Sequence, residues 1–162
     1  MTVIKQTKFS NGQRSVPVAK AAGQEVVVVA AYSFVSGEYN GNTAAAALTA
    51  ATDRIEMFIL PAHHAITDMI VIGVAGSALT VDVGLFDGTA GDAVSTTREI
   101  TASLYFDDAS VNAATTRMTL AAGFVIPAVD YDRGVGIVYS GDQALGAGRY
   151  VRLIAKYAPV IL

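Results

Sequence analysis

Apolar and polar residues alternate over several short stretches of the chain, and this period of two residues predicts β-strands. The clearest case is the segment 78–86 (ALTVDVGLF), in which leucines and valines occupy every second position. Thr80, Asp82 and Gly84 lie between them and therefore face the opposite side of the strand. The pattern predicts a strand with one buried face.

The segment 54–60 (RIEMFIL) alternates in the same way, with Ile55, Met57 and Ile59 at every second position. Its remaining residues therefore face the other side of the predicted strand. Proline donates no ladder hydrogen bond, so we expect this strand to end at Pro61.

A different pattern marks residues 25–35 (EVVVVAAYSFV), where four consecutive valines are followed by Tyr32 and Phe34. β-Branched and aromatic residues favour strands, and a continuous apolar run is typical of a strand that is covered on both faces. We therefore predict a core strand that is buried on both faces.

The same criteria predict about eight strands, separated by short clusters of turn residues. They are residues 25–35, 54–60, 66–73, 78–86, 99–108, 115–123, 133–140 and 149–158. Residues 36–52, which are rich in alanine, predict either one or two helical turns or a loop. Short strands at this spacing favour an all-β fold, an antiparallel β-sandwich of the jelly-roll type, with a small barrel as the alternative.

The first 24 residues differ from the rest of the chain. They contain asparagine, glycine and proline without a sustained period, which predicts an extended arm at residues 1–24 in front of a β-sandwich domain at residues 25–162. The arm carries a charge of +4 and the rest of the chain −7. Its basic residues are Lys5, Lys8, Arg14 and Lys20. Such an arm is either a solvated tail or lies on an acidic neighbour, such as a second copy of the domain.

Composition adds a constraint on the surface of the protein. A chain of 162 residues is long enough for one domain with a substantial core. Apolar residues make up 52% of it and charged residues only 15%, which excludes a disordered chain and leaves few charges for the surface of a monomer. We therefore expect part of its apolar surface to be covered in a homo-oligomer.

Other classes of protein are disfavoured by what the sequence lacks. Cysteine is absent, which excludes disulfide frameworks, thiolate metal sites and cysteine nucleophiles. The N-terminus shows no signal peptide, and the longest apolar run, Val26–Tyr32, is far too short to span a membrane. Four basic residues on an acidic chain also make a poor footprint for nucleic acid. We expect a soluble protein without membrane or nucleic-acid partners.

The residues that could carry chemistry form no recognisable constellation. His63 and His64 are adjacent and would point to opposite sides of an extended chain, so a turn is favoured over a metal site with Asp68. Asp130 and Asp132 (DYDRG) lack the other ligands of a calcium loop. There is no nucleophile elbow and no glycine-rich nucleotide loop. We predict no catalytic residue, no metal site and no cofactor.

Two glycines lie inside the predicted strand 133–140. Gly134 and Gly136 do not belong to a nucleotide-binding fingerprint, because no helix opens after them. Glycine inside a strand usually marks a bulge, a bend or the close approach of another backbone. We therefore assign both glycines to backbone geometry.

Two parts of the chain resemble small structural proteins of tailed bacteriophages, of the kind found beside or on the capsid. In residues 53–92 an apolar strand ends in LPA, a T-D turn leads into the next strand, and the alternating TVDVGL is followed by a glycine-rich D-G loop. Residues 130–159 resemble the closing hairpin of the same group, with DRGVGI, a loop, and then A-G before an apolar and basic strand.

The resemblance implies a non-enzymatic virion protein that decorates or stabilises the capsid in many copies and is often trimeric. It implies self-association and contact with the major capsid protein or other virion proteins. The expected location is the head surface of the virion, after assembly in the host cytoplasm. No active-site residue is carried over. The candidate contact residues are Lys5, Lys8, Arg14, Lys20 and Tyr39.

Two other functions remain open at this point. A receptor-binding or carbohydrate-binding module, such as a fibre tip or adhesin domain, would use loops around Tyr39, Asp87–Asp92 and Asp107–Asn112. The absence of tryptophan counts against stacking on sugars. An enzyme, with a hydrolase as its least implausible form, has no supporting set of residues.

Overall fold

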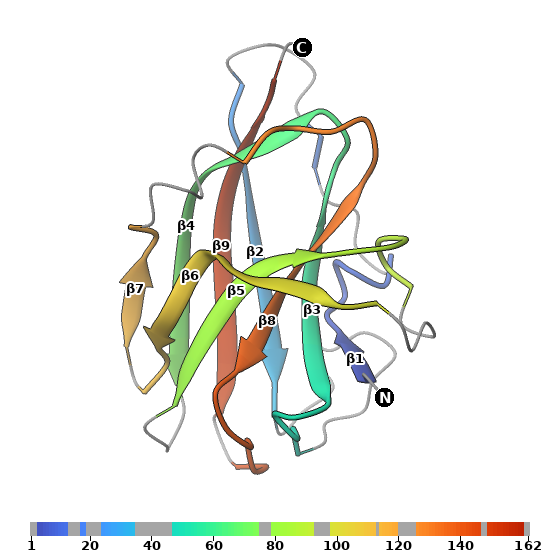
Figure 1. Ribbon diagram of the computed structural model, residues 1–162. Helices are drawn as coiled ribbons and strands as arrows, with labels where there is room; N and C mark the ends of the chain where they lie inside the picture. The colour runs from blue at the N-terminus through green and yellow to red at the C-terminus, as the bar shows by residue number, and fades with distance from the viewer. Residues whose placement is uncertain are drawn as a thin grey trace.

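Two β-sheets make up the part of the chain that the structure describes (Figure 1). The computed structural model describes residues 3–12, 17–18, 24–34, 47–74, 79–92, 98–112, 114–119, 126–146 and 149–160. These residues contain nine strands and no helix. The all-β fold predicted from the sequence is therefore confirmed.

The two sheets form the layers of a sandwich (Figure 1). The five-stranded sheet has the order β1 (Val3–Gln6), β3 (Asp53–Leu60), β8 (Arg133–Tyr139), β5 (Thr80–Phe86), β6 (Ile100–Ser110). The four-stranded sheet has the order β2 (Val26–Ser33), β9 (Tyr150–Pro159), β4 (His64–Val74), β7 (Thr115–Arg117). All neighbouring strands are antiparallel except β1 and β3, which are parallel.

Each of the strands β2 to β9 overlaps one of the eight predicted strand segments, whereas β1 lies in the predicted arm. The predicted strand 115–123 is too long, because β7 ends at Arg117. The jelly-roll connectivity stays a prediction. Within the predicted helix or loop at 36–52, residues 47–52 form a turn and an isolated bridge between Leu48 and Gln143. Residues 35–46 lie outside the described residues.

The alternation predicted for residues 54–60 is interrupted by a bulge. The register of β3 against β8 shifts between Glu56 and Phe58. As a result Phe58 is fully buried, whereas Ile59 is partly exposed. The prediction that Ile59 shares a buried face with Ile55 and Met57 is wrong, because a bulge changes the face to which later residues point.

The prediction that residues 25–35 form a strand buried on both faces is wrong, because only one face of β2 is buried. It lies at the edge of its sheet, and only one face packs on the core. Val28 and Ala30 are buried, but Val27 is 50% exposed and Val29 is 48% exposed. A continuous apolar run therefore does not mean that both faces of this strand are buried.

Aromatic rings from both sheets meet in the core. The rings of Tyr157 from β9 and Phe58 from β3 are stacked with centroids 6.4 Å apart. Phe34, directly after β2, meets the ring of Tyr139 from β8 edge-on at 5.8 Å. Both geometries are favourable for aromatic pairs, so these contacts hold the two layers together.

Candidate assembly surface

Strand β2 forms one edge of the four-stranded sheet, and no strand in the described residues pairs with its other side. It is eight residues long and pairs with β9 without a register shift. It contains neither a charged residue nor a proline. A long, regular and apolar edge strand is a template for pairing with another chain.

The outer face of the same sheet carries an apolar row that begins at this edge. Val29, Ile154 and Ile70 are cross-strand partners on β2, β9 and β4. The two isoleucines are partly exposed, and Val29 is about half exposed. Val27 extends the apolar surface along β2. We call Val27, Val29, Ile154 and Ile70 the outer apolar row.

Basic side chains border the outer apolar row on β9. Lys156 is the cross-strand partner of Val27, and Arg152 is the partner of Ala31. Both basic residues are partly exposed. The guanidinium of Arg152 lies 5.2 Å from the centroid of the Tyr150 ring. The face therefore combines apolar contact area with positive charge.

The other described sheet edges are shorter, bulged or charged. The register of β6 against β5 shifts twice, and Ser103 and Asp108 in β6 have φ values of 60° and 53°. Asp107 and Asp108 are also exposed there. Strand β7 has three residues including the exposed Arg117, and β1 has four residues. Bulges, charges and short length all discourage edge pairing.

The first described residues, Val3–Gln6, form the edge strand β1 of the five-stranded sheet. Lys5 in β1 is 6% exposed, and its Nζ lies 3.2 Å from Oδ2 of Asp53. Ser10 Oγ donates a hydrogen bond of 2.7 Å to the carbonyl oxygen of Glu56. Lys8 is partly exposed in the turn between them. The charge of Lys5 is thus neutralised within the chain.

Three of the five predicted contact residues, Arg14, Lys20 and Tyr39, lie outside the described residues. The structure brings Lys5 and Lys8 to neighbouring positions at the edge strand β1. A contact role for these residues and the domain boundary after residue 24 stay predictions.

Strand β3 also carries one member of a buried ion pair, which no local pattern in the sequence predicts. Glu56 is 0% exposed and Arg98 is 2% exposed. Arg98 Nη2 donates to Glu56 Oε1 at 2.6 Å. Gln6 Nε2 donates to Oε2 at 3.1 Å, and the backbone N–H of Gly91 donates to Oε1 at 3.2 Å. The carboxylate is therefore fully surrounded by donors, as a buried charge requires.

Arg98 also fixes the connection between β5 and β6. Its Nε donates to the carbonyl oxygen of Asp87 at 2.9 Å, and its Nη1 donates to that of Asp92 at 2.8 Å. Its guanidinium lies 4.8 Å from the centroid of the Phe86 ring. The pair of Glu56 and Arg98 thus attaches this connection to the sheet.

The two glycines of β8 make room for this arrangement. A Cβ at Gly134 would lie 2.1 Å from Glu56 Oε1 and 2.9 Å from Arg98 Nη2. A Cβ at Gly136 would lie 2.2 Å from an atom of the Phe86 ring. The sequence assigns both glycines to backbone geometry, but the groups that lie nearest to them are the side chains of Glu56 and Phe86.

Strands β4 and β7 are joined by an exposed ion pair. Arg117 donates to both carboxylate oxygens of Asp68, from Nε at 2.9 Å and from Nη2 at 2.8 Å. These hydrogen bonds are the main reason why the pKa of Asp68 lies below its usual value. Asp68 is therefore engaged with Arg117 and not with the histidines.

Several tyrosines are buried between the sheets. Burial, with a smaller effect from the charge of Asp53, raises the pKa of Tyr32 to about 12. The Tyr32 hydroxyl is buried and has no hydrogen-bond partner among the described residues. The pKa of Tyr157 is also raised to about 12 by burial, and its hydroxyl donates to the carbonyl oxygen of Pro17. The Tyr157 hydroxyl is thus hydrogen-bonded, whereas within the described part of the chain the Tyr32 hydroxyl is not.

His63 lies in a turn, as predicted, whereas His64 is the first residue of β4. His63 has a φ of 61°, and its N–H donates to the carbonyl oxygen of Val129 at 2.6 Å. His64 is 4% exposed, with Nδ1 2.8 Å from the carbonyl oxygen of Ala62. Among the described residues, no three histidine, aspartate or glutamate side chains are grouped so that they could hold a metal ion. The described residues also include no helix long and apolar enough to cross a membrane.

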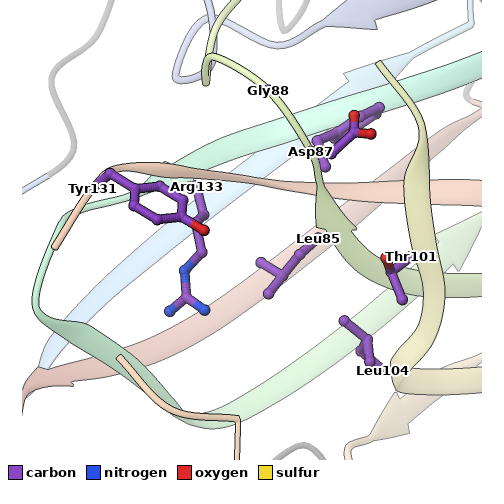
Figure 2. Close-up of a pocket in the computed structure, with 8 residues that line it drawn as sticks. Leu85, Asp87, Gly88, Thr101, Leu104, Tyr131 and Arg133 are labelled. Atoms are coloured by element: carbon purple, nitrogen blue, oxygen red, sulfur yellow. The ribbon is translucent and has the colours of Figure 1, made fainter. Parts of the chain in front are cut away.

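A cavity of about 280 Å³ lies where β5 ends and β8 begins, beside β6. Figure 2 shows Tyr131 and Arg133 on one side of it, with Leu85, Thr101 and Leu104 on the other. Tyr131 is 59% exposed. Arg133 is 6% exposed and donates to the backbone carbonyl oxygens of Pro127 and His64. The cavity thus combines an exposed aromatic ring with a buried arginine that is already bound to backbone.

Comparison with solved structures identifies proteins of the same fold. A chain titled as the capsid of Ralstonia phage GP4 matches with a TM-score of 0.79 and 24% identity, over 98% of this chain and 99% of that chain. A chain of the capsid asymmetric unit of cyanophage Pam1 matches with a TM-score of 0.55 and 18% identity, over 91% and 93%. No protein-family model and no curated protein sequence matches this chain.

The matches cover nearly the whole of both chains, so the entire described sandwich, and not a single motif, has the fold of these capsid proteins. The resemblance to head-associated structural proteins of phages, first seen in residues 53–92 and 130–159, is therefore confirmed at the level of the fold.

Proposed function

We propose that this chain is a non-enzymatic structural protein of a tailed-bacteriophage virion, and that it self-associates and decorates or stabilises the head shell. The observation that carries the proposal is the match over the full chain to a phage capsid structure, with a TM-score of 0.79. Because one fold can serve many functions, the surface of this chain must also suit the role.

The surface supports assembly more than it supports catalysis. The outer apolar row and the free edge of β2 offer a regular, apolar contact surface. The buried charges Glu56 and Arg98 are bonded to each other and to backbone groups that hold the sandwich together. Their role is therefore to stabilise the fold.

A decoration protein also benefits from repetition. Each subunit that contacts both a neighbouring copy and the shell is held by linked contacts, and the second contact forms at a high effective concentration. Weak individual contacts then suffice to hold the protein on a particle. The basic residues Lys8, Arg14 and Lys20 are proposed to add a contact with an acidic neighbour.

The direct test is mass spectrometry of intact virions that are purified from a lysate of the phage encoding this chain. We expect the chain as a stoichiometric component of the head fraction. Heads made without the chain should bind the recombinant protein in co-sedimentation. Absence of the chain from purified virions, together with no co-sedimentation, would overturn the proposal.

The basic residues have their own test in the same co-sedimentation assay. The variant Lys8→Ala/Arg14→Ala/Lys20→Ala should bind heads more weakly than the wild type, with a smaller dependence on salt. The matched control is Arg117→Ala, which removes an exposed positive charge on β7, at the opposite edge of the four-stranded sheet from β2. Equal binding by the triple variant and the wild type would remove these residues from the contact.

The cavity beside Tyr131 favours a second candidate function, a carbohydrate-binding or receptor-binding module. Its rim includes Asp87 and Gly88, which belong to the loop Asp87–Asp92 that the sequence analysis proposed for this role. An exposed tyrosine next to a cavity can stack on a sugar. A glycan array in which the wild type gives a saturable signal and Tyr131→Ala does not would favour this function.

A further inference from the structure

The free edge of β2 lacks every protection that the other described edges carry. It has no bulge, no charged residue and no proline over eight residues. Two of its valines, Val27 and Val29, are about half exposed. An edge of this kind invites strand pairing unless another strand covers it.

We infer that β2 pairs in antiparallel orientation with β2 of a second copy of this chain, so that two four-stranded sheets become one continuous sheet across a two-fold axis. This inference rests on the proposed self-association and names the surface through which it occurs. A two-fold contact needs a surface that is complementary to itself.

The sequence of β2 is complementary to itself when two copies pair about Val28. If the two-fold axis lies between the Val28 residues of the two copies, then Val27 of one copy lies opposite Val29 of the other, and the reverse holds as well. Directly opposed side chains in an antiparallel pair have Cβ atoms about 4.5–5.5 Å apart, so these valines are in contact. The four valines join the outer apolar rows of the two copies. No like charges face each other.

Charge complementarity favours the same register. Glu25 then lies opposite Ala31 of the second copy, and Arg152 is the cross-strand neighbour of Ala31 on β9. Within its own sheet Glu25 is directed across β9, where its Oε1 accepts a hydrogen bond of 2.6 Å from Thr67 Oγ1 on β4. This hydrogen bond must open for Glu25 to reach Arg152 of the second copy.

The first test measures the mass of the protein in solution by light scattering after size exclusion. Val27→Lys/Val29→Lys places charges on the edge and should halve the mass that the wild type shows, with an unchanged far-ultraviolet circular dichroism spectrum. The matched control Val18→Lys/Leu145→Lys changes two apolar residues that are 54% and 52% exposed elsewhere. The control should keep the mass of the wild type.

The second test checks the register and does not depend on lysine substitutions. The chain has no cysteine, so single cysteines report only designed contacts. A mixture of Val27→Cys and Val29→Cys proteins should form a disulfide-linked dimer under mild oxidation, because the shorter end of this spacing, about 4.5 Å, is within reach of a disulfide. A mixture of Val18→Cys and Val29→Cys proteins should not.

Three results would overturn the inference. They are a wild type that stays monomeric at all concentrations, a Val27→Lys/Val29→Lys variant that keeps the mass of the wild type, and a cysteine mixture that forms no cross-link. A monomer whose binding to heads is lost in the lysine variant would place a different virion protein on β2. The presence of the chain in virions is measured separately, so failure of this contact is distinguishable from failure of the proposed function.

Discussion

Gly134→Ala is predicted to destabilise the protein by disrupting the buried pair of Glu56 and Arg98. The new Cβ would lie 2.1 Å from Glu56 Oε1 and 3.0 Å from its Cδ, so the carboxylate must move. Displacing it lengthens the 2.6 Å bond to Arg98, and breaking a buried ion pair costs about 3–5 kcal/mol. Domains of this size have a free energy of unfolding of roughly 5–15 kcal/mol, so the variant should fold with markedly reduced stability.

The same substitution should have the opposite sign when the carboxylate is absent. In a Glu56→Ala background the added methyl group no longer meets Oε1, and alanine is favoured over glycine in a strand by about 0.5–1 kcal/mol. Gly134→Ala should therefore be neutral or stabilising there. Urea unfolding of the wild type, both single variants and the double variant gives the coupling energy between the two positions.

Two outcomes would refute this reasoning. One is a Gly134→Ala protein whose unfolding free energy lies within about 0.5 kcal/mol of the wild type, which is the range of ordinary surface substitutions. The other is an equal cost of Gly134→Ala in both backgrounds. Either result would mean that Gly134 is not required by the carboxylate of Glu56.

Three further predictions concern polar groups at the edges of the core. Tyr32→Phe should leave stability unchanged or raise it, because the Tyr32 hydroxyl is buried without a partner among the described residues. Tyr157→Phe should lower stability, because its hydroxyl loses the hydrogen bond to the carbonyl oxygen of Pro17. Urea unfolding of both variants and the wild type measures the difference. The pKa of Tyr32 is about 12 in the folded protein and about 10 in an unfolded chain. The contribution of the protonated Tyr32 to the free energy of unfolding is therefore complete below pH 10 and is lost as the pH rises toward 12. A Tyr32→Phe variant that loses as much stability as the wild type over that range would contradict this. The pKa of Asp68 is lowered, so its pair with Arg117 stabilises the fold fully above the unfolded pKa of about 4 and less as the pH falls through the folded pKa. The stability difference between the wild type and Asp68→Asn should therefore shrink in acid. A difference that stays constant with pH would contradict this prediction.

Local pattern was sufficient to predict most of the strands. The alternation in residues 78–86 predicts that Val81 and Val83 share a buried face, and both are buried in β5. Strand β1 was missed because its four residues include Lys5 and Gln6, which are polar in sequence but buried in the structure. Their burial depends on pairing with β3, about fifty residues away, and no local period encodes that contact.

The buried ion pair could not be found from sequence for a similar reason. Glu56 and Arg98 are 42 residues apart, and Glu56 occupies a position that the alternation assigns to the exposed face. The only local signal was a pair of glycines inside the strand 133–140. Those glycines indicated backbone geometry, whereas the structure identifies the carboxylate and the ring of Phe86 as the approaching groups.

The four valines of β2 show how composition and structure together locate a contact. Low charge predicts that apolar surface is covered by a partner, but composition does not say where. The apolar run suggested a strand enclosed by its own domain, yet Val27 and Val29 are about half exposed. Both readings are reconciled if one face of β2 is buried by its own core and its free edge is paired in the assembly. The valine run of β2, which is more apolar than its own fold requires, then indicates that a partner strand covers it.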